Sequence, residues 1–216
     1  MVTNLPVAVL RRYEIQYTLI VKRWYKIMTD RIFDAIEFAV KAHRGQFRKG
    51  SHVPYIVHPI GVSKLLIEAG CDEDVVIAGL LHDTLEDTPV TVQEIKLSFG
   101  AKIAGIVEGI SEPDKKDTWE HRKTHTIETL KTAPLDNLLV ECADKLDNIR
   151  AIRKDLTRLS DGLWQRFKRG KDKQQWYYNS LMEAFSQRAD ESPQLSLLFK
   201  EFKEETEEVF VVKSEK

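Results

Sequence analysis

Residues 72–89 read DEDVVIAGLLHDTLEDTP, and this stretch decides how the surrounding sequence is interpreted. Asp72 can cap a helix, the apolar residues 75–81 would form its buried part, and Thr88-Pro89 ends the pattern because proline cannot continue a helix. The six residues that follow the apolar run include four ionisable ones, which are His82, Asp83, Glu86 and Asp87. On one helix they would stack on one side, and three crowded carboxylates repel one another unless a cation or a proton compensates. The stretch therefore predicts a core helix that ends in a functional site, with a metal as the simplest counter-charge.

The segments on either side also follow helical periodicity. Ile32, Ile36, Ala39 and His43 are spaced 4-3-4, which predicts a helix from Asp30 to Gly45. Pro59 can open another helix, and residues 91–94 fit a capping box that begins a short one. Further amphipathic helices are expected near 103–110, 119–130, 135–153, 172–189 and 194–210. No stretch alternates apolar and polar residues long enough to predict a sheet, so the expected fold is all-α.

Length and composition indicate one soluble domain with an appended element. The chain has 216 residues, of which 42% are hydrophobic and 31% charged, and this excludes general disorder and a disulfide scaffold. The net charge of -1 argues against duplex nucleic acid or an anionic membrane as the main partner. Residues 1–28 contain neither an apolar run of membrane-spanning length nor a signal-peptide pattern, so we expect a cytoplasmic protein. Cys71 and Cys142 are expected to be buried free thiols.

Two other segments carry residue types suited to a metal site. His58 stands immediately before Pro59, so its imidazole would lie at a stiff helix start, which suits a ligand. Asp144 and Asn148 share one ridge of a helix whose other side is apolar. Asp144 would then either lie on the surface or point into the core for a functional reason, and the sequence pattern alone leaves both possibilities open.

Taken together, these residues resemble a known family. His58-Pro59, His82-Asp83 with Glu86-Asp87, and Asp144 with Asn148, in this order and spacing, are similar to the HD-superfamily hydrolase domain of RelA/SpoT-type proteins, and most of all to the stand-alone small alarmone hydrolases. The resemblance covers about residues 30–155 and includes the segment 42–50. It implies an HD-domain helical bundle in residues 29–190, preceded by an extension, residues 1–28, that is an accessory helix or an upstream-start segment. A C-terminal helix and charged tail would occupy 191–216.

The resemblance also implies roles for individual residues. The family's metal ligands, typically for Mn²⁺, match His58, His82, Asp83 and Asp144. Its catalytic acidic pair matches Glu86 and Asp87, and its substrate-contacting positions match Arg48, Lys49 and Asn148. The family removes the 3′-pyrophosphate of guanosine tetra- and pentaphosphate, (p)ppGpp, to give GDP or GTP and pyrophosphate. Independently, two imidazoles and two carboxylates with room for water suit Mn²⁺ better than a structural zinc, which usually prefers thiolates.

Several interpretations remain open at this stage. Glu141 and Asp147 stand where the family more often has a lysine and a histidine or aromatic residue, and an extra acid could disfavour a guanosine polyphosphate. The alternatives are an HD-type phosphohydrolase of another nucleotide (an adenosine alarmone, NADPH or a nucleoside phosphate) and a non-catalytic alarmone-binding module; a homo-oligomer is compatible with any of them.

The placement of some residues is also open. Arg48 and Lys49 could be part of a plain solvated loop. The basic and aromatic segment 163–178 would either reach over the site or form a helix junction. His43 is expected to lie in the core or behind the ligands, and Tyr55 to pack beside Pro54 or stack on a base.

Overall fold

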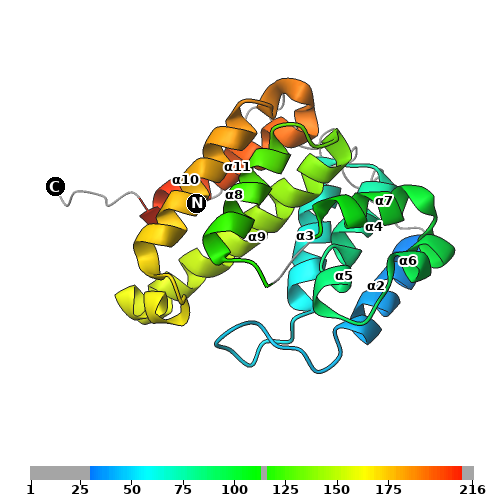
Figure 1. The fold of residues 1–216 in the computed structure, drawn as a ribbon, viewed down its shortest axis with the longest axis horizontal. Helices are drawn as coiled ribbons and strands as arrows, with labels where there is room; N and C mark the ends of the chain where they lie inside the picture. Colours follow the sequence, from blue (N-terminus) through cyan, green and yellow to red (C-terminus); the bar gives the residue numbers. More distant parts are fainter. Residues whose placement is uncertain (1–29, 113–115, 211–216) are drawn as a thin grey trace, which may run out of the picture.

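The computed structural model describes residues 30–112 and 116–210, which form a bundle of helices (Figure 1). The helices are α2 (Asp30–Ala42), α3 (Val57–Ala69), α4 (Glu73–Leu81), α5 (Thr84–Asp87), α6 (Val92–Phe99), α7 (Ala101–Ile110), α8 (Trp119–Leu130), α9 (Leu135–Leu159), α10 (Gly170–Ser186) and α11 (Pro193–Phe210), with 3-10 turns at Ser160–Arg166 and Ala189–Glu191. Among these residues the only β-type pairing is an isolated bridge between Phe47 and Pro54. The predicted all-α fold is confirmed. No helix in the described part combines the length and apolar character that crossing a membrane requires.

The longest helix of the described residues, α9, runs through the middle of the bundle and positions the site. It packs against α3, α4 and α7 on one side and against α11 on another (Figure 1). Its inward residues Leu138, Cys142, Leu146 and Ile149 are completely buried, as their spacing predicts. Burying a leucine or isoleucine side chain contributes about 1.5–3 kcal/mol, so this face anchors α9 firmly. The residues between these anchors are thereby held at fixed positions beside α3 and α4.

The helix predicted from residue 72 to 88 is interrupted at its functional end. α4 stops at Leu81 and α5 starts at Thr84, so His82 and Asp83 form a turn between them, and the expectation of one continuous helix is wrong. Two local bonds accompany the break: the Thr84 hydroxyl donates to the carbonyl of Leu81 at 2.6 Å, and the His82 Nδ1 lies 2.8 Å from the carbonyl of Gly79. Side chains that bond to nearby carbonyls compete with the regular helix pattern.

Most other predicted helix boundaries are close to the observed ones, except that α9 continues past the predicted end at residue 153 to Leu159. The capping box at the start of α6 is present, with Thr91 accepting from the Glu94 backbone N–H and Glu94 accepting from that of Thr91. α3 begins at Val57, which places His58 and Pro59 in its first turn. Proline is tolerated there because the first backbone N–H groups of a helix have no partner within the helix. The start of the chain through residue 29 lies outside the described residues, and with it the predicted extension.

The C-terminal helix α11 packs into the same hydrophobic core as the preceding helices. Its residues Leu195, Leu198 and Phe202 are buried, and the carboxylate of Glu205 is paired with Arg150 and Arg153 of α9. The charged stretch 200–208 therefore has a buried side as well as a solvated one. The division of the chain at residue 190 stays a prediction, and residues 211–216 lie outside the described part.

Candidate metal centre and active site

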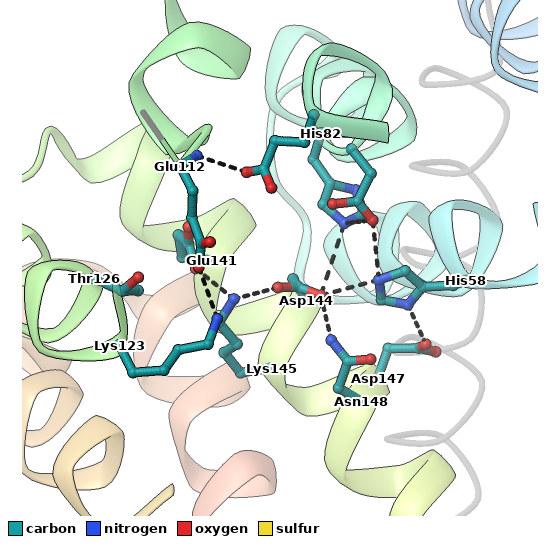
Figure 2. Close-up of polar contacts among 12 residues, drawn as sticks. His58, His82, Glu112, Lys123, Thr126, Glu141, Asp144, Lys145, Asp147 and Asn148 are labelled. Carbon is teal, nitrogen blue, oxygen red and sulfur yellow. Dashed lines mark hydrogen bonds and ion pairs between the residues drawn. The ribbon is translucent and has the colours of Figure 1, made fainter. Parts of the chain in front are cut away.

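Four residues from three segments converge at one buried point (Figure 2). His58 comes from the first turn of α3, His82 and Asp83 from the turn after α4, and Asp144 from the middle of α9. The Nε2 of His58 lies 3.0 Å from Asp144 Oδ1, and the Nε2 of His82 lies 2.9 Å from Asp83 Oδ2. The crossed distances, His58 Nε2 to Asp83 Oδ2 and His82 Nε2 to Asp144 Oδ1, are both 3.7 Å. The packing of α3 and α4 on α9 therefore produces a compact set of two nitrogen and two oxygen donors.

This donor set fits a divalent cation. One donor atom each from His58, His82 and Asp144 lie within 4.8 Å of one another, and all three residues are buried. The Nε2 of His82 is buried, and although Asp83 Oδ2 lies 2.9 Å away, the two atoms do not have hydrogen-bond geometry. A buried polar atom without such a partner is costly, and a metal ion satisfies it. Imidazole and carboxylate groups together suit ions of hard or borderline character.

The electrostatics of the cluster reflect this close approach. Burial opposes the charge on His82, but Asp83 outweighs it and raises the pKa of His82 to about 10. For Asp144, burial would raise the pKa, yet Lys145 and the two imidazoles hold it well below its usual range. The same balance lowers the pKa of Asp83, where the imidazoles outweigh burial. Both aspartates are therefore carboxylates at neutral pH, the form in which they can bind a cation.

Neighbouring side chains hold the ligand carboxylates in place. The Tyr55 hydroxyl donates to Asp83 Oδ2 at 2.5 Å, and burial together with Asp83 raises the pKa of this tyrosine. Lys145 Nζ donates to one oxygen of Asp144 at 2.5 Å, and Asn148 Nδ2 donates to the other at 2.6 Å. The sequence analysis did not predict that Tyr55 holds Asp83 or that Lys145 holds Asp144. Their proximity in sequence to His58 and Asp144 was the available signal, but it does not reveal which way a side chain points.

A cavity of about 410 Å³ opens beside the cluster. It is lined by Arg48, Tyr55, His58, His82, Asp83, Glu86, Ile110, Glu112, Arg122, Lys123, Thr126, Val140, Glu141, Asp144, Lys145 and Asn148. Glu86 is one of the lining residues, and its Oε1 accepts the backbone N–H of Glu112 at 2.6 Å. The cavity thus has room for a ligand next to both the donor set and an acidic side chain.

The wall opposite the histidines is rich in charge and was not predicted. α8 contributes Arg122 and Lys123, and both donate to the carboxylate of Glu112, Lys123 at 2.7 Å. Burial would raise the pKa of Glu112, but Lys123 and Arg122 outweigh it and lower the pKa. On α9, Lys145 pairs with Glu141 at 3.0 Å (Figure 2). Cations held at a cavity wall by exchangeable carboxylates are suited to receive phosphate groups.

The structure brings most of the predicted site residues together and leaves two outside the cavity. Arg48 lines it, donates to Asn148 Oδ1 at 2.8 Å and lies over the Tyr55 ring. Lys49 instead lies over the ring of Phe167, 5.9 Å from its centre, and is not among the described lining residues. Asp87 is likewise not among them, and its backbone carbonyl accepts a hydrogen bond from Gln46. Adjacent residues in a loop or short helix point in different directions, which a sequence motif does not show.

The structure also shows where segment 163–178, His43 and the two unusual acids lie. Segment 163–178 forms a helix junction whose Trp164, Tyr177 and Tyr178 are buried, and none of its described residues lines the cavity. His43 is buried and its Nδ1 lies 2.8 Å from Gln46 Oε1, outside the donor set. Of the two unusual acids, Glu141 lines the cavity, whereas Asp147 turns to His58 (Figure 2).

An all-helical bundle that brings two histidines and two aspartates together beside a cavity lined by basic residues is the arrangement expected of an HD domain. The family model for the HD domain matches residues 35–172, and the chain belongs to this family.

Curated relatives share substantial identity with this chain. The human guanosine-3′,5′-bis(diphosphate) 3′-pyrophosphohydrolase MESH1 is 41% identical over 136 residues, a match that covers 62% of this chain and 73% of MESH1. The guanosine-3′,5′-bis(diphosphate) 3′-pyrophosphohydrolase of Aquifex aeolicus is 40% identical over 130 residues. That match covers 59% of this chain but only 18% of the Aquifex protein, so the chain corresponds to a small part of this longer relative.

Two solved structures have the same fold. The crystal structure of lmo0812 from Listeria monocytogenes aligns with a TM-score of 0.65 at 36% identity, covering 71% of this chain and 98% of that one. A structure described as a metazoan ortholog of SpoT that hydrolyses ppGpp and plays a role in starvation responses aligns with a TM-score of 0.67 at 29% identity. The second alignment covers 81% of this chain and 94% of its counterpart.

Proposed function

We propose that this protein is a cytoplasmic enzyme that hydrolyses the 3′-pyrophosphate of (p)ppGpp and releases GDP or GTP and pyrophosphate. The observation that carries the proposal is the convergence of His58, His82, Asp83 and Asp144 beside a cavity lined by cations. MESH1 and the Aquifex protein, which are named for this reaction, support the substrate class. We assign the activity to residues 29–190, because every described residue that lines the cavity lies between Arg48 and Asn148.

We assign the four donors to one divalent ion, Mn²⁺ being the proposed one, with His58 and His82 as nitrogen ligands and Asp83 and Asp144 as oxygen ligands. Two imidazoles and two carboxylates favour such an ion over a structural zinc, and no thiol of the described residues lines the cavity. An ion of this type lowers the pKa of water and offsets charge on phosphate. Tyr55, Lys145 and Asn148 would keep the two carboxylates oriented through the hydrogen bonds described above.

Glu86 is the proposed general base. Glu86 lines the cavity beside the donor set, and its carboxylate would accept the proton of the attacking water. The water oxygen forms a bond to the phosphorus attached to the 3′ oxygen, and the bond between that phosphorus and the 3′ oxygen breaks. The electron pair stays on the 3′ oxygen, which becomes the ribose hydroxyl by taking a proton from water, and the protonated Glu86 returns its proton to the hydroxide that this leaves. Asp87 was predicted to share this role with Glu86, and its contribution stays a prediction because its side chain is not among the described lining groups.

The cations of the cavity wall are proposed to bind the phosphates. Arg48 and Asn148 would contact the pyrophosphate beside the metal site, and Lys123 and Lys145 would face its charge from the opposite wall. Their present partners are Glu112, Glu141 and Asp144, so phosphate oxygens would compete with carboxylates for the same ammonium groups. Arginine supplies two parallel hydrogen bonds and lysine a mobile charge. Glu141 therefore does not exclude an anionic substrate, because Lys145 compensates its charge.

The two adjacent basic residues of the 42–50 segment are expected to behave differently. Arg48→Ala should raise the KM for ppGpp about tenfold, because a charged hydrogen bond contributes roughly 1.5–3 kcal/mol. Lys49→Ala is the matched control and should change KM by less than about twofold, since Lys49 lies over Phe167 rather than in the cavity. Steady-state kinetics of the two variants decide the point. An equal rise in KM for the two variants would indicate a long-range electrostatic effect. It would contradict the placement of Arg48 inside the cavity and of Lys49 outside it.

The function is tested with purified protein, Mn²⁺ and a panel of nucleotides. We expect pyrophosphate and GDP from ppGpp, detected by ion-exchange chromatography and a pyrophosphate-specific assay. NADPH, adenosine alarmones and nucleoside phosphates serve as competing substrates in the same preparation. Release of pyrophosphate or orthophosphate from one of these, with ppGpp left intact, would replace the proposed function by that of another HD-type phosphohydrolase. Binding of ppGpp without turnover would indicate an alarmone-binding module instead.

A further inference from the structure

Both ring nitrogens of His58 lie against carboxylates. The Nε2 faces Asp144 in the donor set at 3.0 Å, whereas the Nδ1, on the other side of the ring, lies 2.6 Å from Asp147 Oδ2 (Figure 2). Asp147 does not line the cavity and does not belong to the group of described residues that could hold a metal. The imidazole of His58 is almost completely buried, and three-quarters of the Asp147 side chain is covered. This is the arrangement in which a carboxylate fixes a histidine ligand from behind.

A glycine in α3 provides the space that Asp147 occupies. Gly61 follows His58 by one helical turn, and a Cβ atom placed on Gly61 would lie 2.3 Å from Asp147 Oδ1 and 3.1 Å from its carboxyl carbon. Such a contact is too short for non-bonded atoms, so any side chain at position 61 would displace the carboxylate. Glycine is unfavourable inside a helix, and nothing in the backbone conformation of α3 requires it here. The close approach of Asp147 accounts for its presence.

The second histidine is fixed in a different way. The Nδ1 of His82 lies 2.8 Å from the backbone carbonyl of Gly79, a neutral acceptor. In both residues the Nδ1 is occupied and the Nε2 points to the shared donor set. In a neutral imidazole, a proton held on Nδ1 by an acceptor leaves the lone pair on Nε2. Asp147 therefore holds the Nδ1 proton of His58 with a charged carboxylate, whereas the Gly79 carbonyl holds that of His82 with a neutral oxygen.

We propose that Asp147 is a positioning residue that orients His58 and increases its strength as a metal ligand, and that Gly61 is required for this contact. The inference rests on the proposed function through the assignment of His58 as a ligand. Carboxylates that bond the far nitrogen of a ligating histidine fix its tautomer and raise its basicity, and their loss lowers metal affinity about 10- to 100-fold. A purely structural Asp147 would affect stability and leave the metal affinity unchanged.

The experiment is a calorimetric titration of the metal-free full-length protein with Mn²⁺, with thermal unfolding of each variant measured separately. Asp147→Ala should weaken Mn²⁺ binding about 10- to 100-fold. Asp147→Asn keeps an acceptor oxygen of the same size without the charge, and should lose less. Gly61→Ala should weaken binding although it leaves Asp147 chemically intact. Asp155→Asn is the matched control, because Asp155 is another α9 carboxylate with one arginine partner, Arg166 at 2.8 Å, and it does not line the cavity. It should bind Mn²⁺ like the wild type.

The double variant Gly61→Ala/Asp147→Ala makes the test specific. If the glycine acts only through the carboxylate, the double variant should bind Mn²⁺ no more weakly than Asp147→Ala alone, since the two changes remove one interaction. Wild-type affinity in Asp147→Ala, with only a lower melting temperature, would overturn the inference. That result leaves the proposed function standing, because the wild-type titration and the ppGpp assay test the metal site and the reaction by themselves. Additive losses in the double variant would overturn the role assigned to Gly61.

Discussion

Asp83→Asn is expected to remove Mn²⁺ binding and to lower the rate of ppGpp hydrolysis by roughly 10³-fold or more. The substitution keeps the size of the side chain and an oxygen that can accept from the Tyr55 hydroxyl, but it removes the charge that faces His82 at 2.9 Å. Metal ions contribute several kcal/mol of charge stabilisation in phosphate hydrolysis, and about 1.36 kcal/mol corresponds to each tenfold in rate. Metal content, Mn²⁺ affinity and turnover are the quantities to measure.

Asp83 is preferable to Asp144 for this experiment. Removing the Asp144 carboxylate would leave Lys145 buried without its closest partner, and breaking a buried pair costs about 3–5 kcal/mol, so loss of activity would be mixed with unfolding. Asp74→Asn is a suitable control, because Asp74 lies on the preceding helix α4 and pairs with Arg31 at 3.0 Å on the surface. Chelation of the wild-type protein should reproduce the Asp83→Asn result, and added Mn²⁺ should restore the wild type alone. Unchanged turnover after complete metal removal would contradict the metal assignment.

Glu86→Gln is expected to keep Mn²⁺ binding and lose turnover. Glutamine retains an oxygen that can accept the backbone N–H of Glu112, so the side chain should stay in place. It cannot take a proton from water, and general-base catalysis typically contributes 10²- to 10⁴-fold, so we expect kcat to fall by about this factor with little change in KM. Single-turnover rates and an Mn²⁺ titration on the same preparation separate chemistry from binding.

Asp87→Asn is the informative comparison for Glu86→Gln. The two residues are neighbours in the acidic pair predicted from sequence, but only Glu86 is among the described residues that line the cavity. We therefore expect a much smaller loss of kcat from Asp87→Asn. If Asp87→Asn is the inactive variant and Glu86→Gln turns over normally, the base has been assigned to the wrong carboxylate.

The features that the sequence by itself determined depend on interactions between residues close together in the chain. Helical periodicity, the capping box at Thr91 and the apolar face of α9 depend on residues a few positions apart, so the amino-acid pattern alone is enough to predict them. The resemblance to the HD superfamily likewise rested on short motifs, and the match of the HD domain model to residues 35–172 confirmed it. The residue types at positions 58, 82, 83 and 144 indicated a metal because imidazole and carboxylate chemistry does not depend on the fold.

Tertiary structure decided which side chains meet. The different surroundings of Arg48 and Lys49 and the basic wall from α8 depend on which segments distant in sequence lie beside them. Asp147 shows this most directly, since its contact with His58 joins residues 89 positions apart and exists only where Gly61 leaves space. A sequence pattern specifies the face of a helix on which a residue lies. The partner across that face is set by the packing of the whole core, which short-range patterns do not contain.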